Sequence, residues 1–269
     1  MTARADQALA CNGVLNLACT CVHPPRMSFK THPRSTKSFE TKRFRWKPTR
    51  ARVVMAATVS SQGGRDAFEE FLMGSGRVTT VSHKLWEKLV QPGDTVVDGT
   101  VGNGHDTLNL AKLAVTEGGD AGRVVGFDVQ DVAIRATACK LDQDLTPAQA
   151  ARVELLHLCH SRMGEFVRPR EARLVCFNLG YLPGGDKDVM TLSSSTTAAL
   201  QAATEAIMVG GLLNIIAYRH EHQHDGGEDE YATVLSFVRA LEPKEWNVVS
   251  GDMLNRHRSP VLICCYRKT

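Results

Sequence analysis

The sequence predicts an α/β fold in which helices cover both faces of an open, mostly parallel β-sheet. Short apolar runs alternate with segments of helical periodicity between residues 95 and 240, which indicates successive βαβ units. Two successive apolar runs close the chain, so one strand near the C-terminus is expected to be antiparallel. The 269 residues are 43% hydrophobic and 23% charged, as in ordinary globular proteins. No apolar run approaches 18 residues, so no membrane partner is expected.

The first half of the expected domain alternates regularly between helix and strand. Apolar residues recur at helical spacing over residues 79–94, and Pro92 and Gly93 end that helix. The segments that follow are strand 95–100, helix 105–117, strand 122–130, helix 131–143 and strand 151–161. The residues of helix 105–117 that are expected to face the core are Leu108, Ala111, Leu113 and Ala114.

The second half begins with a strand and a polar loop over residues 172–185. A helix is expected at residues 196–211, because Gly210 and Gly211 suit a helix C-terminus. The remaining segments are strand 212–220, helix 228–243, strand 246–253 and strand 259–268. The cysteines follow no framework spacing, which predicts free thiols, and Cys264 and Cys265 are expected to be buried in the last strand.

A polar, glycine-rich loop, DGTVGNGHDT, follows the first strand and opens the next helix at residues 98–107. Ligands bind open α/β sheets at the carboxyl ends of the strands, so this loop is expected to hold a cofactor. Gly102 and Gly104 permit close approach of the backbone. The dinucleotide fingerprint would need glycine in place of Thr107, and a phosphate loop would need a lysine that the segment lacks. The acidic loop better suits S-adenosylmethionine, which is cationic and has no phosphates.

Polar residues also follow the second and third expected strands. Asp128 lies about 30 residues after Asp98. An acid at this position can accept hydrogen bonds from both ribose hydroxyls. A helix cap or a turn would explain any one of these residues alone, but not their repetition after three strands. The residues expected to bind S-adenosylmethionine are Asp98, Thr100, Gly102, Asn103, Gly104, Asp106, Thr107, Asp128, Gln130, His160 and Ser161.

The segment FNLGYLPGGDK, residues 177–187, follows the fourth expected strand, where a methyl acceptor would lie. Amine-directed methyltransferases use a related [DN]-P-P-[YF] turn, in which the Asn or Asp and a backbone carbonyl accept hydrogen bonds from the target nitrogen. This segment keeps Asn178, one proline and the aromatic Tyr181, but not the spacing. Packing alone would also explain Tyr181. No metal site is expected.

Five segments together resemble the rRNA methylase family: VVDGTVGNGHDTLNLA, GFDVQ, FNLGYLPGGDK, TTAALQAA and a C-terminal N…SP. The resemblance covers about residues 78–269, and the GNGHDT and NLGYLPGGDK blocks are its most specific parts. It implies a class I methyltransferase-like Rossmann sheet with S-adenosylmethionine as cofactor. The family includes the bacterial tRNA 5-aminomethyl-2-thiouridine methyltransferase. It therefore implies N-methylation of a wobble uridine, with the tRNA anticodon loop as partner.

The resemblance also implies roles for individual residues. Asn178 would orient the amine, Tyr181 would stack on the uracil, and Asp186 or a loop histidine would relay a proton. The family usually carries Y-x-G-H-x-G-G-x-E-E after the fifth strand, whereas this chain reads YRHEHQHDGGEDE. His224 aligns best with the family histidine, and His220 and His222 stay open as alternatives. The residues expected to act in catalysis are Asn178, Tyr181 and Asp186, and those expected to contact the substrate are Tyr181, Lys187, His224 and Arg256.

Two other functions stay open at this point. The chain could methylate rRNA or a small amine, or it could bind RNA or a nucleotide without catalysis. The intact NLGYLPGGDK segment argues against the second alternative, because a non-enzyme has no need of an acceptor loop. The sequence does not decide whether the chain forms a homodimer.

The N-terminal segment differs from the rest in charge. Residues 1–54 carry 11 Lys and Arg against 2 Asp and Glu, whereas the remainder carries 21 against 27. This basic composition, rich in Ser, Thr and Pro, predicts an organelle transit peptide over residues 1–55. A chloroplast is favoured over a mitochondrion, and a nucleic-acid-binding arm is the alternative. A linker at residues 56–77 and the methyltransferase domain at residues 78–269 would follow.

Overall fold

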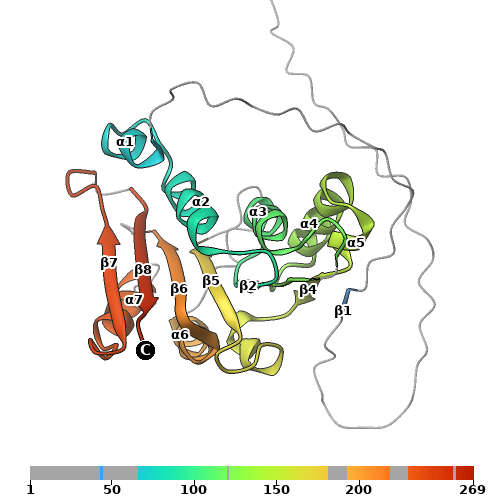
Figure 1. The fold of residues 1–269 in the computed structure, drawn as a ribbon. Helices are drawn as coiled ribbons and strands as arrows, with labels where there is room; N and C mark the ends of the chain where they lie inside the picture. The colour runs from blue at the N-terminus through green and yellow to red at the C-terminus, as the bar shows by residue number, and fades with distance from the viewer. Residues whose placement is uncertain (1–42, 45–65, 120, 181–192, 219–229, 257–258) are drawn as a thin grey trace, which may run out of the picture. The chain divides into compact units, whose positions relative to one another are not determined.

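The computed structural model describes residues 43–44, 66–119, 121–180, 193–218, 230–256 and 259–269, and it confirms the predicted α/β fold (Figure 1). The strands are β1 (Arg43–Phe44), β2 (Thr95–Asp98), β3 (Arg123–Asp128), β4 (Val153–His157), β5 (Ala172–Leu179), β6 (Ile207–Ala217), β7 (Trp246–Gly251) and β8 (Val261–Arg267). The helices are α1 (Ala67–Leu72), α2 (Val78–Leu89), α3 (His105–Ala114), α4 (Asp131–Asp144), α5 (Pro147–Ala150), the 3₁₀ helix η1 (His160–Glu165), α6 (Ser193–Ala206) and α7 (Glu230–Arg239).

The strands form one sheet in the order β1-β4-β3-β2-β5-β6-β8-β7. Strands β2 to β6 pair in parallel, whereas β8 is antiparallel to both β6 and β7, as predicted for one strand near the C-terminus. The short β1 pairs antiparallel with β4. The chain runs outward from β2 through β3 to β4 and then returns to β5. The switch point, where ligands bind such sheets, therefore lies between β2 and β5.

Two hydrophobic cores fill the two faces of the sheet. Helices α2, α3 and α4 cover one face, and η1, α6 and α7 cover the other (Figure 1). Adjacent residues of β2 serve opposite cores, because successive strand side chains point to opposite faces: Val96 packs under α3 and Val97 under α6. Trp86 fixes α2 to the sheet, since its indole Nε1 donates a buried 2.8 Å hydrogen bond to Asn214 Oδ1 on β6.

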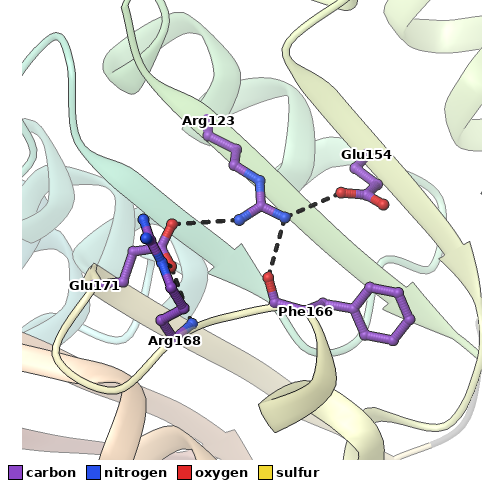
Figure 2. Close-up of polar contacts among 5 residues, drawn as sticks. All are labelled: Arg123, Glu154, Phe166, Arg168 and Glu171. Atoms are coloured by element: carbon purple, nitrogen blue, oxygen red, sulfur yellow. Dashed lines mark hydrogen bonds and ion pairs between the residues drawn. The ribbon is translucent and has the colours of Figure 1, made fainter.

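Arg123 ties together the amino ends of three strands, opposite the switch-point edge (Figure 2). Its guanidinium bonds Glu154 at 3.0 Å, Glu171 at 3.3 Å and the carbonyl of Phe166 at 3.1 Å. Arg168 pairs with Glu171 from the other side. Arg123 and Arg168 are thus paired with acidic residues near the amino ends of the strands, away from the switch-point edge.

The boundary between α6 and β6 differs from the expectation. Residues 207–211 were expected to end a helix, but α6 stops at Ala206 and β6 begins at Ile207. Gly210, at φ 78°, lies inside β6, where the pairing with β5 shifts register. The two glycines thus accommodate a bulge in a strand rather than a helix C-terminus.

Two further differences concern residues outside the expected elements. Helix α1 lies within the expected linker and buries Phe71 against Val78. The expected site residues Tyr181, Asp186, Lys187 and His224 fall outside the described residues. Among the described residues, no helix is long and apolar enough to cross a membrane.

Candidate active site

The glycine-rich loop is stretched across the switch point between its two neighbouring strands. After β2 ends, Gly99 N donates to the carbonyl of Cys176 on β5 at 2.8 Å, and Val101 N donates to that of Phe127 on β3 at 3.0 Å. Gly102 N then donates to Asp128 Oδ2 at 2.9 Å. These bonds carry the loop over the carboxyl ends of β5 and β3, where the sequence predicted the cofactor site.

Gly104 is required by both conformation and space. It precedes α3 in the left-handed region at φ 75°, where side chains are disfavoured. A Cβ at this position would lie 2.5 Å from Thr137 Oγ1 on α4. Thr137 Oγ1 in turn donates to the carbonyl of Gly102 at 3.1 Å. Helix α4 thus packs directly against the loop and fixes its path.

Asp98 braces the loop from inside. It is fully buried and accepts hydrogen bonds from Thr107 Oγ1 at 2.6 Å and from Thr100 N at 3.1 Å. Burial, helped by the nearby charge of Asp106, raises the pKa of Asp98 to about 7. The structure therefore gives Asp98 a role within the loop, and its predicted contact with the cofactor stays a prediction.

Asp128 at the end of β3 and His160 at the start of η1 lie close enough to interact electrostatically. Burial raises the pKa of Asp128, whose carboxylate accepts from Gly102 N and, at 2.8 Å, from Gln130 N. Each oxygen keeps a second lone pair. His160 Nδ1 donates to the carbonyl of Gly99 at 3.1 Å, so Nε2 is an acceptor. Among the described residues that buried Nε2 has no partner, and burial lowers the pKa of His160, which favours the neutral ring.

These features fit S-adenosylmethionine. Adenosine offers hydroxyl and amino donors, which match the spare lone pairs of Asp128 and the unpaired Nε2 of His160. The predicted cofactor residues that the structure gathers at this edge are Asp98, Thr100, Gly102, Asn103, Gly104, Thr107, Asp128, Gln130 and His160. Ser161 lies next to His160, but its hydroxyl donates to Cys159 Sγ at 3.1 Å. Asp106 instead contacts His83 on α2 and Asn178 on β5.

His83, Asp106 and Asn178 form a series of hydrogen bonds next to the loop. Asn178 N donates to Thr100 Oγ1 at 2.6 Å, which joins β5 to the cofactor loop. Its side-chain Nδ2 donates to Asp106 Oδ2, while His83 Nε2 lies 2.5 Å from Asp106 Oδ1. The remaining oxygen, Asn178 Oδ1, is buried without a hydrogen-bond partner among the described residues. Besides His160 Nε2, the site thus presents a second unused acceptor, as a donor-bearing substrate would require.

A hollow of about 380 Å³ lies between the end of β6, the start of β8 and the start of α2. Ile216, which is paired in register with Asn178, lies on its wall. Arg77, Arg256 and the half-exposed ring of Tyr218 line it as well. Of these, the sequence predicted only Arg256. Arg77 and His83 were missed, because single residues on a helix before the loop form no spacing pattern.

Comparison with known proteins agrees with this geometry. Residues 124–267 match the family model described as "Putative rRNA methylase". This chain belongs to that family. The rRNA methylase family prediction from the sequence is therefore confirmed.

Individual relatives show how far the similarity extends. The chloroplastic tRNA (mnm(5)s(2)U34)-methyltransferase of Arabidopsis thaliana is 41% identical over 210 residues, which cover 77% of this chain and 75% of that protein. The structure of a putative rRNA-methylase from Clostridium thermocellum is 35% identical, with a TM-score of 0.63 over 71% of this chain and 97% of its own. A putative methyltransferase from Streptococcus mutans, solved in complex with SAH, is 30% identical, with a TM-score of 0.60 over 71% and 98%.

Proposed function

We propose that this chain is an S-adenosylmethionine-dependent methyltransferase that converts 5-aminomethyl(-2-thio)uridine at the tRNA wobble position into 5-methylaminomethyl(-2-thio)uridine. The observation that carries the proposal is the buried, unpaired Oδ1 of Asn178 beside the cofactor loop. A primary amine brings N–H donors, so it satisfies this oxygen. The name of the Arabidopsis relative supports the choice of substrate.

The protein has to align a neutral amine with the methyl donor. S-adenosylmethionine, when bound, supplies a methyl group whose carbon bonds to the amine while the C–S electron pair stays on sulfur. An amine with a pKa near ~10.4 is neutral in only about one molecule in a thousand at pH 7. A partly desolvated site lowers that pKa. By accepting one N–H, Asn178 Oδ1 directs the nitrogen lone pair, and the surplus proton of the product leaves to solvent.

The hollow between β6, β8 and α2 provides the contacts that an RNA loop would use. Arg77 and Arg256 are exposed residues on its wall, where they would meet phosphates, and Arg256 Nη1 also donates to the carbonyl of Gly74 at 3.4 Å. Tyr218 offers a ring on which a base would stack, worth ~1–3 kcal/mol. An anticodon loop requires only a few such contacts, which agrees with the small excess of acidic residues after residue 54. The proposal retains the expected substrate contacts of Tyr181, Lys187 and His224. It also retains Asp186 as a proton relay.

The proposal extends to the N-terminal segment. Residues 1–55 would be a transit peptide that directs the chain to the chloroplast, with the mitochondrion as the alternative. The relative named as chloroplastic supports this destination. Residues 56–77 would link the transit peptide to the methyltransferase domain at residues 78–269, although α1 already packs against that domain.

A single-turnover assay on tRNA that carries the aminomethyl group tests the proposal. Asn178→Ala should lower the methylation rate by roughly 100-fold, because loss of alignment by about 1 Å has that effect, while S-adenosylmethionine binding changes only a few-fold. The matched control is the same tRNA without the aminomethyl group, which should accept no methyl. Equal methylation of both tRNAs, or preferential methylation of rRNA, would reject the amine substrate.

A further inference from the structure

Three residues from three separate elements form one chain of hydrogen bonds behind the acceptor oxygen. His83 on α2 contacts Asp106 Oδ1 on α3 through Nε2 at 2.5 Å. Asp106 Oδ2 accepts from Nδ2 of Asn178 on β5. Asp106 is almost completely buried, whereas His83 is partly exposed. Both carboxylate oxygens of Asp106 therefore have partners on the acceptor side.

The hydrogen bond with Asp106 determines the orientation of the Asn178 side-chain amide. An ionised carboxylate only accepts hydrogen bonds, so the amide must turn its NH₂ toward Asp106. The amide oxygen is thereby turned away from Asp106. The reversed amide would set two acceptors against each other and leave its NH₂ buried at the position of Oδ1. The same argument assigns the proton on His83 to Nε2.

Asp106 needs such partners because it lies close to another acid. Its charge acts on the buried Asp98 across the first turn of α3. A donor from His83 on one oxygen and one from Asn178 on the other compensate the carboxylate at its buried position. The ring of His83 is itself held against Trp86, with centroids 4.9 Å apart. Helix α2, which Trp86 holds against the sheet, thus positions the hydrogen-bonded series of His83, Asp106 and Asn178.

We propose that Asp106 and His83 are positioning residues for methyl transfer: Asp106 fixes the Asn178 amide with Oδ1 toward the acceptor amine, and His83 holds the Asp106 carboxylate. This inference rests on the proposed function, because it takes the acceptor amine as the partner of Oδ1. It moves Asp106 from the cofactor side, where the sequence placed it, to the acceptor side. It also gives α2 a part in the reaction.

A pair of substitutions at His83 separates positioning from proton transfer. Gln can place an amide N–H near the position of imidazole Nε2 but cannot take up a proton near neutral pH, whereas Leu removes the donor. His83→Leu and Asp106→Leu should lower the single-turnover rate on aminomethyl tRNA by about 10- to 100-fold, and His83→Gln by less than about 3-fold. The S-adenosylmethionine Kd should stay within a few-fold of the wild-type value in all three. The rate of His83→Gln should also keep the wild-type dependence on pH.

Ser82 provides the matched control. It precedes His83 on α2 and is fully buried, but its Oγ has no hydrogen-bond partner among the described residues. Ser82→Ala should keep the wild-type rate. Thermal unfolding shows whether each variant is folded. The side-chain amide resonances of Asn178 show whether a loss of rate coincides with an amide that is no longer held by Asp106. If Asp106→Leu does not fold, Asp106→Asn serves as the second variant. It keeps one side-chain oxygen as an acceptor and replaces the other with an NH₂ group.

Three outcomes would overturn the inference while wild-type protein methylates aminomethyl tRNA. Wild-type rates in His83→Leu and Asp106→Leu would remove both residues from the reaction. A parallel loss of S-adenosylmethionine binding would return Asp106 to the cofactor site. A rate for His83→Gln as low as that for His83→Leu would make His83 a proton acceptor instead. Failure of the wild-type protein on this tRNA would instead reject the proposed function.

Discussion

At the scale of single residues, Asp98 shows how the site constrains the fold. A carboxyl group with no solvent contact is held between Thr107 and Thr100 and close to Asp106. Burial first, and the charge of Asp106 second, raise its pKa to about 7, whereas Cys176 beside it keeps its proton because burial raises its pKa as well. The loop that receives the cofactor is thus built around an acid that titrates near neutral pH.

Asp98 should make stability depend on pH. An unfolded Asp titrates near ~3.9, so between about pH 4 and pH 7 the folded protein keeps a proton that the unfolded chain releases. The contribution of Asp98 to the free energy of unfolding is fully present below about pH 4 and is lost as pH rises to about 7, at ~1.4 kcal/mol per pKa unit. Urea unfolding from pH 5 to 8 should therefore show a steeper decline for wild type than for Asp98→Asn. Parallel curves would contradict the raised pKa.

Asp128 should act on the cofactor alone. If its spare lone pairs accept the ribose hydroxyls, Asp128→Ala loses charged hydrogen bonds worth roughly 1.5–3 kcal/mol and should weaken S-adenosylmethionine binding by about 10- to 100-fold. Calorimetry measures this directly. Asp131→Ala is the control, because Asp131 lies three residues further on and pairs with Arg135 on the surface. Unchanged affinity in Asp128→Ala would remove Asp128 from the site.

At the scale of elements, α2 connects the acceptor site to the sheet. Its Trp86 is buried and donates to Asn214 Oδ1 in the middle of β6, and its His83 reaches Asp106 one turn earlier. The helix outlines were predictable, because apolar residues recur every three or four positions. The contact of His83 with Asp106 was not, because it depends on how α2 and α3 pack.

Removing the indole N–H should show this coupling. Trp86→Phe keeps most of the apolar surface but leaves Asn214 Oδ1 buried without its donor, which should lower the free energy of unfolding by about 1–3 kcal/mol. The double variant Trp86→Phe with Asn214→Leu removes both polar groups and should recover part of that loss. Chemical denaturation of the three variants measures the interaction energy. Strict additivity of the two single losses would mean that the hydrogen bond contributes nothing.

Short and irregular elements mark the limit of prediction from sequence at this scale. Helix α5 has 4 residues and α1 has 6, too few for a periodic pattern. The run from Ile207 to Gly211 suggested a helix end, but tertiary pairing with β5 makes it a strand. That the expected cofactor residues would gather at one edge of the sheet was predictable, because the carboxyl ends of parallel strands meet there. The contacts of Asp106 with His83 and Asn178 were not predictable, because they depend on how α2, α3 and β5 pack together.

At the scale of the whole molecule, the N-terminal segment differs from the rest of the chain in charge and contributes little to the described fold. The basic residues 1–54 precede a sheet whose functional edge carries acids, the unpaired Asn178 oxygen and two exposed arginines. Within the described residues, only the two-residue β1 comes from that basic segment. The methyltransferase site is therefore built from residues that follow it.

A chain starting near Ala56 should fold and methylate tRNA as well as the full chain. It loses β1, whose two residues pair only with the edge strand β4. Helix α1, with its cap at Asp66, remains intact. Thermal unfolding and tRNA titration of both chains provide the comparison. If the shorter chain kept cofactor binding but lost tRNA affinity, the segment would be an RNA-binding arm, and the transit-peptide proposal would fail.

The central claim is that the substrate is the aminomethyl group of a tRNA wobble uridine. Mass spectrometry of nucleosides from organelle tRNA, with and without this protein, tests it most directly. We expect tRNA from cells that lack the protein to accumulate 5-aminomethyl(-2-thio)uridine and to lose the 5-methylaminomethyl form. Re-expression should restore the methylated nucleoside, whereas the Asn178→Ala variant should not. An unchanged nucleoside profile in the absence of the protein would contradict the account, and a methyl group missing from rRNA instead would identify a different substrate.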